Sequence, residues 1–196
     1  MYRSFSQAGQ DTFVCAVLNN KKNGKFLEIG ANHPINISNT YMLEKALGWT
    51  GLMVEYDPKF EELYKEHRTS EYVICDARSL DFSNLVGDYD YLQIELEVDN
   101  RSTLDVLRAV SKVMNAHRFA VITFEHDKYR GDFFNTRQES RNILEERGYV
   151  LVFPDVKYGG LPFEDWWVHP DLVNMTYIAH IHRTISLEFT EIVAIL

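Results

Sequence analysis

The chain has 196 residues, 45% of them hydrophobic and 25% charged, a size and composition typical of one globular domain. Its 29 acidic residues outnumber its 20 basic residues and give a formal charge of −9. Because a nucleic-acid binder normally carries a basic surface, and the longest basic run is Lys21–Lys22, we expect no nucleic-acid partner.

Short apolar runs alternate with longer amphipathic stretches through most of the chain. Repeated strand–helix units of this length predict an α/β fold with a doubly wound, mostly parallel, Rossmann-like sheet and an antiparallel last strand. In chain order we expect a strand at 25–31, a helix at 39–47 that begins at Ser38 or Asn39 and ends at Gly48, a strand at 51–55, a helix at 58–67, strands at 72–75 and 89–96, a helix at 102–115, a strand at 119–124, a helix at 136–147, and strands at 149–153 and 163–168.

We expect a single domain over residues 1–196, with a lead-in at 1–24 and a helical tail from about 174 to 196. The tail pattern predicts a terminal helix packed on the domain, and the alternative is a helix that forms a homodimer. The apolar residues at helical spacing are Ile178, Ile181, Ile185, Phe189, Ile192 and Val193.

Apolar segments and cysteines bear on location. No apolar run approaches the ~20 residues that a bilayer-spanning helix needs, and the first residues lack the apolar core of a signal peptide. Cys15 and Cys75 lie far apart, which fits free thiols in a reducing compartment better than a disulfide scaffold. We therefore expect no membrane partner and a cytoplasmic location.

Acidic residues stand at the carboxyl ends of four predicted strands: Glu28, Glu55, Asp76 and Glu95. Ligands of a doubly wound sheet bind outside these strand ends. Carboxylates there accept hydrogen bonds from ribose hydroxyls or an amine, and they repel a pyrophosphate. The acids therefore favour a nucleoside ligand without phosphates.

The loop after the first strand carries one glycine, Gly30, where a dinucleotide fingerprint has three, and there is no P-loop. With Glu55 at the end of the next strand, this loop predicts S-adenosylmethionine as the cofactor. The alternative is that Gly30 is a tight turn and Glu55 a solvated strand end.

These segments resemble the FkbM-type family of class I methyltransferases. The similarity covers about residues 6–173, and 26–32 is its most specific part. The segments that carry it are 6–11, 26–32, 38–40, 43–44, 48–52, 54–58, 90–97, 104–107, 124–126 and 163–168.

The resemblance implies a cofactor site built from four parts. Glu28, Gly30, Ala31 and Asn32 surround the methionine moiety, with Ser38 and Asn39 at the helix start. Glu55, with Tyr56 beside it, holds the ribose hydroxyls. Asp76 and Ala77 contact the adenine. Glu95 faces the sulfonium.

The chain departs from the family pattern twice. His33-Pro34 follows the first motif where the family commonly has Asp-Gly. Glu95 replaces an Asp, and Val98 stands where the family has Gly. We therefore expect a different loop path after Asn32 and a different setting for the substrate.

Methyl transfer to oxygen needs aligned reactants and usually a base for the acceptor hydroxyl. The candidates are Glu95, Glu97, Glu125 and His126, and histidine titrates near neutral pH. The alternative for His126 is a hydrogen bond to backbone at the strand end. A divalent metal held by these groups would also activate a hydroxyl, but no tight ligand spacing supports one, so we expect no metal.

The leading hypothesis is an S-adenosylmethionine-dependent methyltransferase that methylates a hydroxyl of a sugar or another small metabolite. Tyr158, Phe163, Trp166 and Trp167 could stack on a sugar ring; the alternative is that they pack in the core. A second hypothesis is a catalytically silent, cofactor-binding or assembly module. A third, a nicotinamide oxidoreductase, conflicts with the single-glycine loop.

Overall fold

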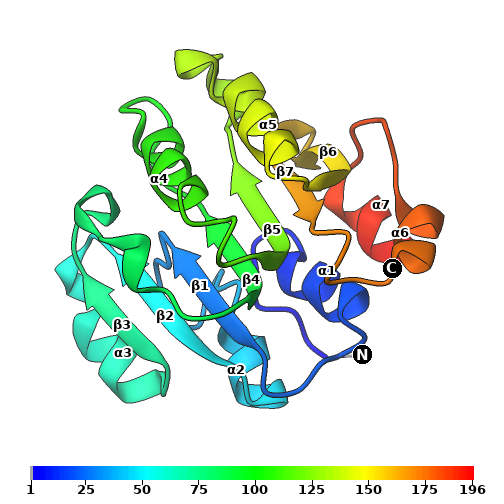
Figure 1. Cartoon of the computed structure of the whole chain (residues 1–196). Helices are drawn as coiled ribbons and strands as arrows, with labels where there is room; N and C mark the ends of the chain where they lie inside the picture. The colour runs from blue at the N-terminus through cyan, green and yellow to red at the C-terminus, as the bar shows by residue number, and fades with distance from the viewer. Residues whose placement is uncertain (1) are drawn as a thin grey trace.

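The computed structural model describes residues 2–196 and contains one seven-stranded sheet flanked by helices (Figure 1). The strand order is β3-β2-β1-β4-β5-β7-β6. The strands are β1 (Lys25–Ile29), β2 (Thr50–Glu55), β3 (Glu71–Ile74), β4 (Tyr89–Ile94), β5 (Phe119–Glu125), β6 (Val150–Tyr158) and β7 (Leu161–Val168). The helices are α1 (Gln10–Val17), α2 (Tyr41–Leu47), α3 (Glu61–His67), α4 (Ser102–Ser111), α5 (Thr136–Glu146), α6 (Met175–Ile181) and α7 (Phe189–Ile195).

The sheet confirms the predicted doubly wound, mostly parallel topology. Strand β1 pairs in parallel with both β2 and β4, and β4 pairs in parallel with β5. Its buried strands are apolar on both faces because helices cover both sides. The carboxyl ends of β1, β2, β4 and β5 therefore meet at one edge.

Strand β7 is antiparallel, as predicted, and it lies between β5 and β6. A two-residue turn, Gly159-Gly160, joins β6 to β7, and both glycines have positive φ (61° and 82°). Such a turn matches the twist of a tight hairpin, so β7 reverses directly on β6. Its other edge is then free to pair with β5.

Two hydrophobic clusters fill the two faces of the sheet. Alternating strand positions divide between them: Phe26 and Trp166 enter one cluster, and Leu27 and Trp167 enter the other. Both tryptophans and Phe163 are buried. The alternative that the aromatic residues pack in the core is thus correct for these three side chains. Tyr158 is exposed and stacks on Phe189 of α7.

Helix α1 lies inside the segment that we expected to be a lead-in. Phe13, Val14 and Val17 are buried at helical spacing in the first of the two clusters. Gly9 precedes the helix with no side-chain cap, so the usual start signal is missing.

The predicted single terminal helix is wrong, because the tail forms two helices, α6 and α7. The connecting segment pairs with the sheet: the Leu187 carbonyl accepts from Lys157 N at 2.8 Å. Glu188 then starts α7 through a reciprocal capping box with Glu191. Ile178 and Ile192 are buried against the domain, whereas Ile185 in the connection is exposed. The homodimer through the tail stays a prediction.

Within residues 2–196, every helix is too short or too polar to span a bilayer.

Candidate active site

A cavity of about 570 Å³ opens at the carboxyl ends of β1, β2, β4 and β5. Its volume is in the range of small-molecule sites. Seven of the predicted cofactor residues line it: Gly30, Asn32, Glu55, Tyr56, Asp76, Ala77 and Glu95. Glu97 and Glu125, two of the candidate bases, line it as well.

Gly30 permits the close approach of two strand ends. A Cβ built on Gly30 would lie 1.8 Å from the carbonyl oxygen of Glu95, and its φ is +83°. Glu95 N donates to the Ile29 carbonyl at 3.0 Å, which fixes this approach. A side chain at position 30 would push the β4 end away from β1, so glycine is required here.

Glu55 fixes the backbone on both sides of the cavity floor. Its two carboxylate oxygens accept from Asn32 N at 2.7 Å and from Asp57 N at 2.8 Å. Asn32 is held in the left-handed region with φ 49°. The remaining lone pairs of Glu55 are available for donors inside the cavity.

Four other predicted cofactor residues lie behind the cavity wall. Glu28 is 1% exposed, and its carboxylate accepts from Asn39 N at 3.0 Å and from the Thr40 hydroxyl. Burial raises the pKa of Glu28 against the opposing charge of Arg68. The remaining three are Ala31, Ser38 and Asn39, which are all buried. These residues shape the loop before α2 and do not line the cavity.

His33 organises the loop where the chain departs from the family pattern. Its Nδ1 accepts from Ile35 N and Asn36 N, both at 3.1 Å. Val98, the second departure, is fully buried and does not line the cavity. Both unusual residues therefore act on backbone or core rather than on a ligand.

The Glu95 carboxylate receives two side-chain amides. Gln93 Nε2 donates to Oε2 at 2.8 Å, and Asn39 Nδ2 donates to the same oxygen at 3.4 Å. Burial and the charge of Glu28 nevertheless raise the pKa of Glu95 to about 7. A carboxyl with this pKa exchanges protons at neutral pH, as a general base must.

Asp127 and Arg130 complete the β5 side of the cavity, and neither was predicted from the sequence. Arg130 bridges the two loops: Nη1 lies 3.4 Å from Glu97 and 3.2 Å from Asp127, and Nη2 lies 3.3 Å from Asp99. Their position within five residues of the β5 end was a usable signal, because ligands bind at strand ends. The left-handed conformation of Asp127 (φ 46°) could not be read from the sequence.

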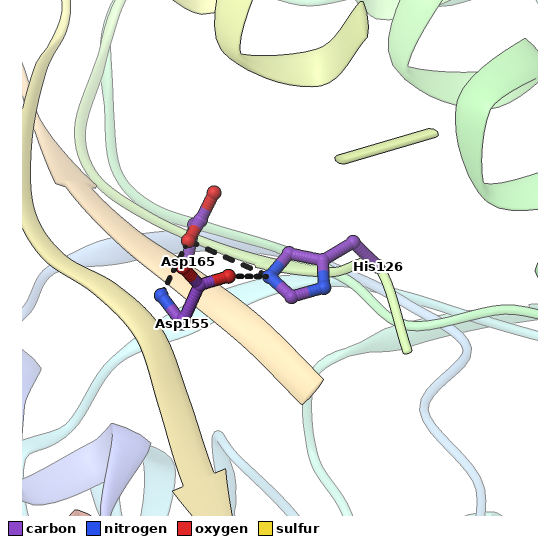
Figure 2. Close-up of side chains that lie close together, drawn as sticks. All are labelled: His126, Asp155 and Asp165. Carbon is purple, nitrogen blue, oxygen red and sulfur yellow. Dashed lines mark hydrogen bonds and ion pairs between the residues drawn. The ribbon is translucent and has the colours of Figure 1, made fainter. Parts of the chain in front are cut away.

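His126 lies outside the cavity, although it follows Glu125 directly. Its ring is buried and faces Asp155 and Asp165, with Nε2 at 3.6 and 3.5 Å from their carboxylate oxygens (Figure 2). Its Nδ1 accepts from Lys128 N at 3.2 Å, so the neutral ring carries its proton on Nε2. The structure therefore does not bring His126 to the other candidate bases.

The donor set of His126, Asp155 and Asp165 is compact enough to suggest a metal ligand set. Arg141 pairs with both oxygens of Asp165 at 2.7 Å, and Arg137 pairs with both oxygens of Asp155. The protonated Nε2 and these two arginines occupy the positions that a cation would need. The chemistry of this cluster thus does not fit a metal.

Solved structures of methyltransferases resemble this fold. A TehB-like SAM-dependent methyltransferase from Corynebacterium glutamicum aligns with a TM-score of 0.56 at 17% identity, over 84% of this chain and 89% of its own. A putative rRNA methylase from Clostridium thermocellum gives 0.55 at 12% identity, over 86% and 99%. The chain has a Rossmann-like methyltransferase fold. No family model and no curated protein matches it, so the resemblance to the FkbM-type family stays a prediction.

Proposed function

We propose that this protein binds S-adenosylmethionine and transfers the methyl group to a hydroxyl of a sugar or another small metabolite, as an FkbM-type enzyme. The observation that carries the proposal is the contact of Gly30 with the β4 end beside Glu95, at the edge of a cavity with Glu55 on the neighbouring strand. This arrangement joins one glycine loop to carboxylates on two strand ends.

The chemistry of the cavity fits this cofactor. Carboxylates of Glu55 and Asp76 accept from hydroxyl and amine groups, and they disfavour a phosphate-bearing dinucleotide. When bound, S-adenosylmethionine supplies a methyl group on a positively charged sulfur. Glu95 offers the anionic oxygen that such a charge requires.

Glu95 is also the proposed base for the acceptor hydroxyl. It lines the cavity, and its pKa of about 7 lets it take up a proton at Oε near neutral pH. Glu97 holds Arg130 at the rim of the cavity. His126 has no part in this proposal because its ring lies in the cluster with Asp155 and Asp165.

Calorimetric titration with S-adenosylhomocysteine tests the proposal. We expect micromolar binding, and we expect Glu55→Ala to weaken it by ~1–3 kcal/mol because charge-assisted hydrogen bonds are lost. Glu71→Ala is the matched control, since Glu71 is exposed at the opposite end of β3, the strand that follows β2.

Three outcomes separate the hypotheses. An absence of heat and of a thermal shift would reject the methyltransferase. Binding of NADH instead would support the oxidoreductase. Tight cofactor binding without methyl transfer to any hydroxylated acceptor would support the silent module.

A further inference from the structure

Gln93 precedes Glu95 by two positions at the end of β4, and the proposed function gives it no role. Side chains two positions apart on a strand point to the same face of the sheet. Gln93 is 1% exposed, and in the strand register it lies between Glu28 of β1 and Thr123 of β5. Because strands flank it on both sides, its side chain has a fixed place beside the Glu95 carboxylate.

The amide of Gln93 is oriented by Glu95. Its Nε2 donates to Glu95 Oε2 at 2.8 Å, while its own Oε1 is buried without a donor in residues 2–196. Reversal of the amide would place Oε1 against an anion and would lose a charge-assisted hydrogen bond, which is stronger than a neutral one. The unpartnered oxygen, which faces away from Glu95, is tolerated because the N–H group is held at the carboxylate.

The two oxygens of the Glu95 carboxylate have different surroundings. Oε2 receives both amides, from Gln93 at 2.8 Å and from Asn39 at 3.4 Å. Oε1 accepts from no donor in residues 2–196 and is not sealed from solvent, and Glu95 lines the cavity. Oε1 is thus the oxygen that a ligand in the cavity can reach.

The amide donors oppose the acids around Glu95. Burial and the charge of Glu28 raise the pKa of Glu95, and the hydrogen bonds from Asn39 and Gln93 lower it, so that the pKa is about 7. No basic side chain within residues 2–196 forms an ion pair with Glu95 or Glu125. Without the Gln93 donor, Glu95 would be protonated at neutral pH and could not accept a proton. The other acids that face this carboxyl are Asp127, Glu125 on β5 and Glu164 on β7.

We infer that Gln93, assisted by Asn39, is a positioning residue that holds Oε2 of Glu95 and leaves Oε1 as the oxygen that takes the proton of the acceptor hydroxyl. The inference rests on the proposed function and adds a residue to it. The hydroxyl oxygen forms a bond to the methyl carbon as its O–H bond breaks, and the proton passes to Oε1. The electron pair of the broken carbon–sulfur bond stays on the sulfur. The Gln93 N–H group remains on Oε2 throughout.

The pKa of Glu95 can be measured in the cofactor-free protein by carbon-13 NMR of labelled glutamate side chains, with the Glu95 signal identified by its loss in Glu95→Gln. Gln93→Met keeps the length of the side chain and removes the donor. We expect it to raise the midpoint of Glu95 by at least about one pH unit, because a hydrogen bond to a charged group is lost. Asn39→Ala removes the longer hydrogen bond and should raise the midpoint less.

Thr123→Val is the matched control. Thr123 is fully buried and opposite Gln93 in the strand register, and its hydroxyl shares a hydrogen bond of 2.7 Å with the Tyr91 hydroxyl. The change removes a buried hydrogen bond beside Gln93 that does not reach Glu95, so the midpoint should stay where it is. A shift as large as that in Gln93→Met would show that loosening of the sheet moves the pKa, and it would overturn the inference.

A second measurement is the preference for S-adenosylmethionine over S-adenosylhomocysteine, determined by calorimetry from about pH 6 to about pH 8.5. In the unmodified protein the preference should increase as Glu95 ionises near pH 7, because only the first ligand carries a sulfonium. Gln93→Met should move this increase to higher pH by the shift that NMR gives. A general loss of packing would weaken both ligands and would not move the midpoint.

The unmodified protein provides a further measurement if Gln93→Met does not fold, as circular dichroism and thermal melting would show. The Nε2 amide protons of Gln93 should shift with the same midpoint as the Glu95 carboxyl, because they donate to it. This titration should be absent in Glu95→Gln.

The outcomes separate this inference from the proposed function. If S-adenosylhomocysteine does not bind the unmodified protein, both fall. If it binds, but the Glu95 midpoint is the same in Gln93→Met, or the Gln93 amide protons do not follow Glu95, only the role of Gln93 is overturned. A shifted midpoint without a shifted cofactor preference would place Oε1 away from the cavity and would also overturn it.

Discussion

Glu125 and His126 are neighbours at the end of β5, yet their side chains enter two opposite electrostatic settings. On the His126 side, Asp155 and Asp165 are matched by Arg137 and Arg141. On the Glu125 side, the carboxylates of the cavity outnumber the arginines, and those arginines are already engaged. The matched charges around His126 hold the fold together, whereas the cavity keeps more acidic than basic side chains.

The largest effect on stability should come from removing one member of the matched set of charges around His126. Arg141→Ala leaves Asp165, which is fully buried, without its bidentate partner, and we expect a loss of ~3–5 kcal/mol in the free energy of unfolding. Arg108→Ala is the control, because its pair with Glu139 is exposed and should be worth less than ~1 kcal/mol. Urea unfolding measures both; equal losses would erase the distinction between the two settings.

The cavity carboxyl groups that lack a basic partner should make the free energy of unfolding depend on pH. The pKa of Glu95 is raised from 4.5 to about 7 in the folded protein, so folding favours its protonated form. The resulting stability is present below about pH 4.5 and is lost as the pH rises through about 7. We expect a fall of ~1–3 kcal/mol across this window by urea unfolding.

Glu95→Gln should make this pH dependence shallower without removing it. Glu28 and Glu125 face the same carboxyl, and burial raises the pKa of each, so they contribute with the same sign. An unchanged slope in Glu95→Gln would show that Glu95 is not a source of the dependence.

A smaller effect should separate the methylated cofactor from its product. S-adenosylmethionine carries a sulfonium and S-adenosylhomocysteine does not, so loss of the Glu95 charge should weaken only the first markedly. We expect Glu95→Gln to reduce the preference for S-adenosylmethionine by ~1 kcal/mol, about fivefold, by calorimetry. Parallel losses for both ligands would place the Glu95 charge away from the sulfur.

The smallest effect concerns metals. Addition of Zn²⁺ or Mg²⁺ should leave the melting temperature unchanged, because Arg137, Arg141 and the proton on His126 Nε2 already satisfy the acids around His126. A chelated sample provides the baseline. A stabilising shift that His126→Gln removes would reveal a bound ion.

Much of this fold could be predicted from the periodicity of the apolar residues and from the residues that begin and end helices and strands. The apolar run at β1, the lone Gly30 and the acid at the end of β2 are local features, and each lies where it was expected. Helix α1 was missed because Gly9 gives no side-chain cap, and the tail was misjudged because Leu187 pairs with β6 through a long-range backbone bond.

The site was predicted less completely, for a physical reason. Strand alternation shows that adjacent residues diverge, but it does not show which of Glu125 and His126 enters the cavity. That choice depends on Asp165, which lies on β7 and meets His126 only after the hairpin folds back. Glu28 was placed at the ligand as an acid at a strand end and Asn39 through the family resemblance, whereas both are buried and Asn39 N donates to the Glu28 carboxylate.

The insertion of β7 between β5 and β6 also bears on the order of assembly during translation. The edge of β5 that receives β7 cannot be covered until β7, which ends at Val168, has itself left the ribosome after β1 to β5. An unpaired, apolar edge is a template for association with other chains. The nascent protein should therefore be most prone to aggregate while only β1–β5 have emerged, and release of the β6–β7 hairpin should end this period.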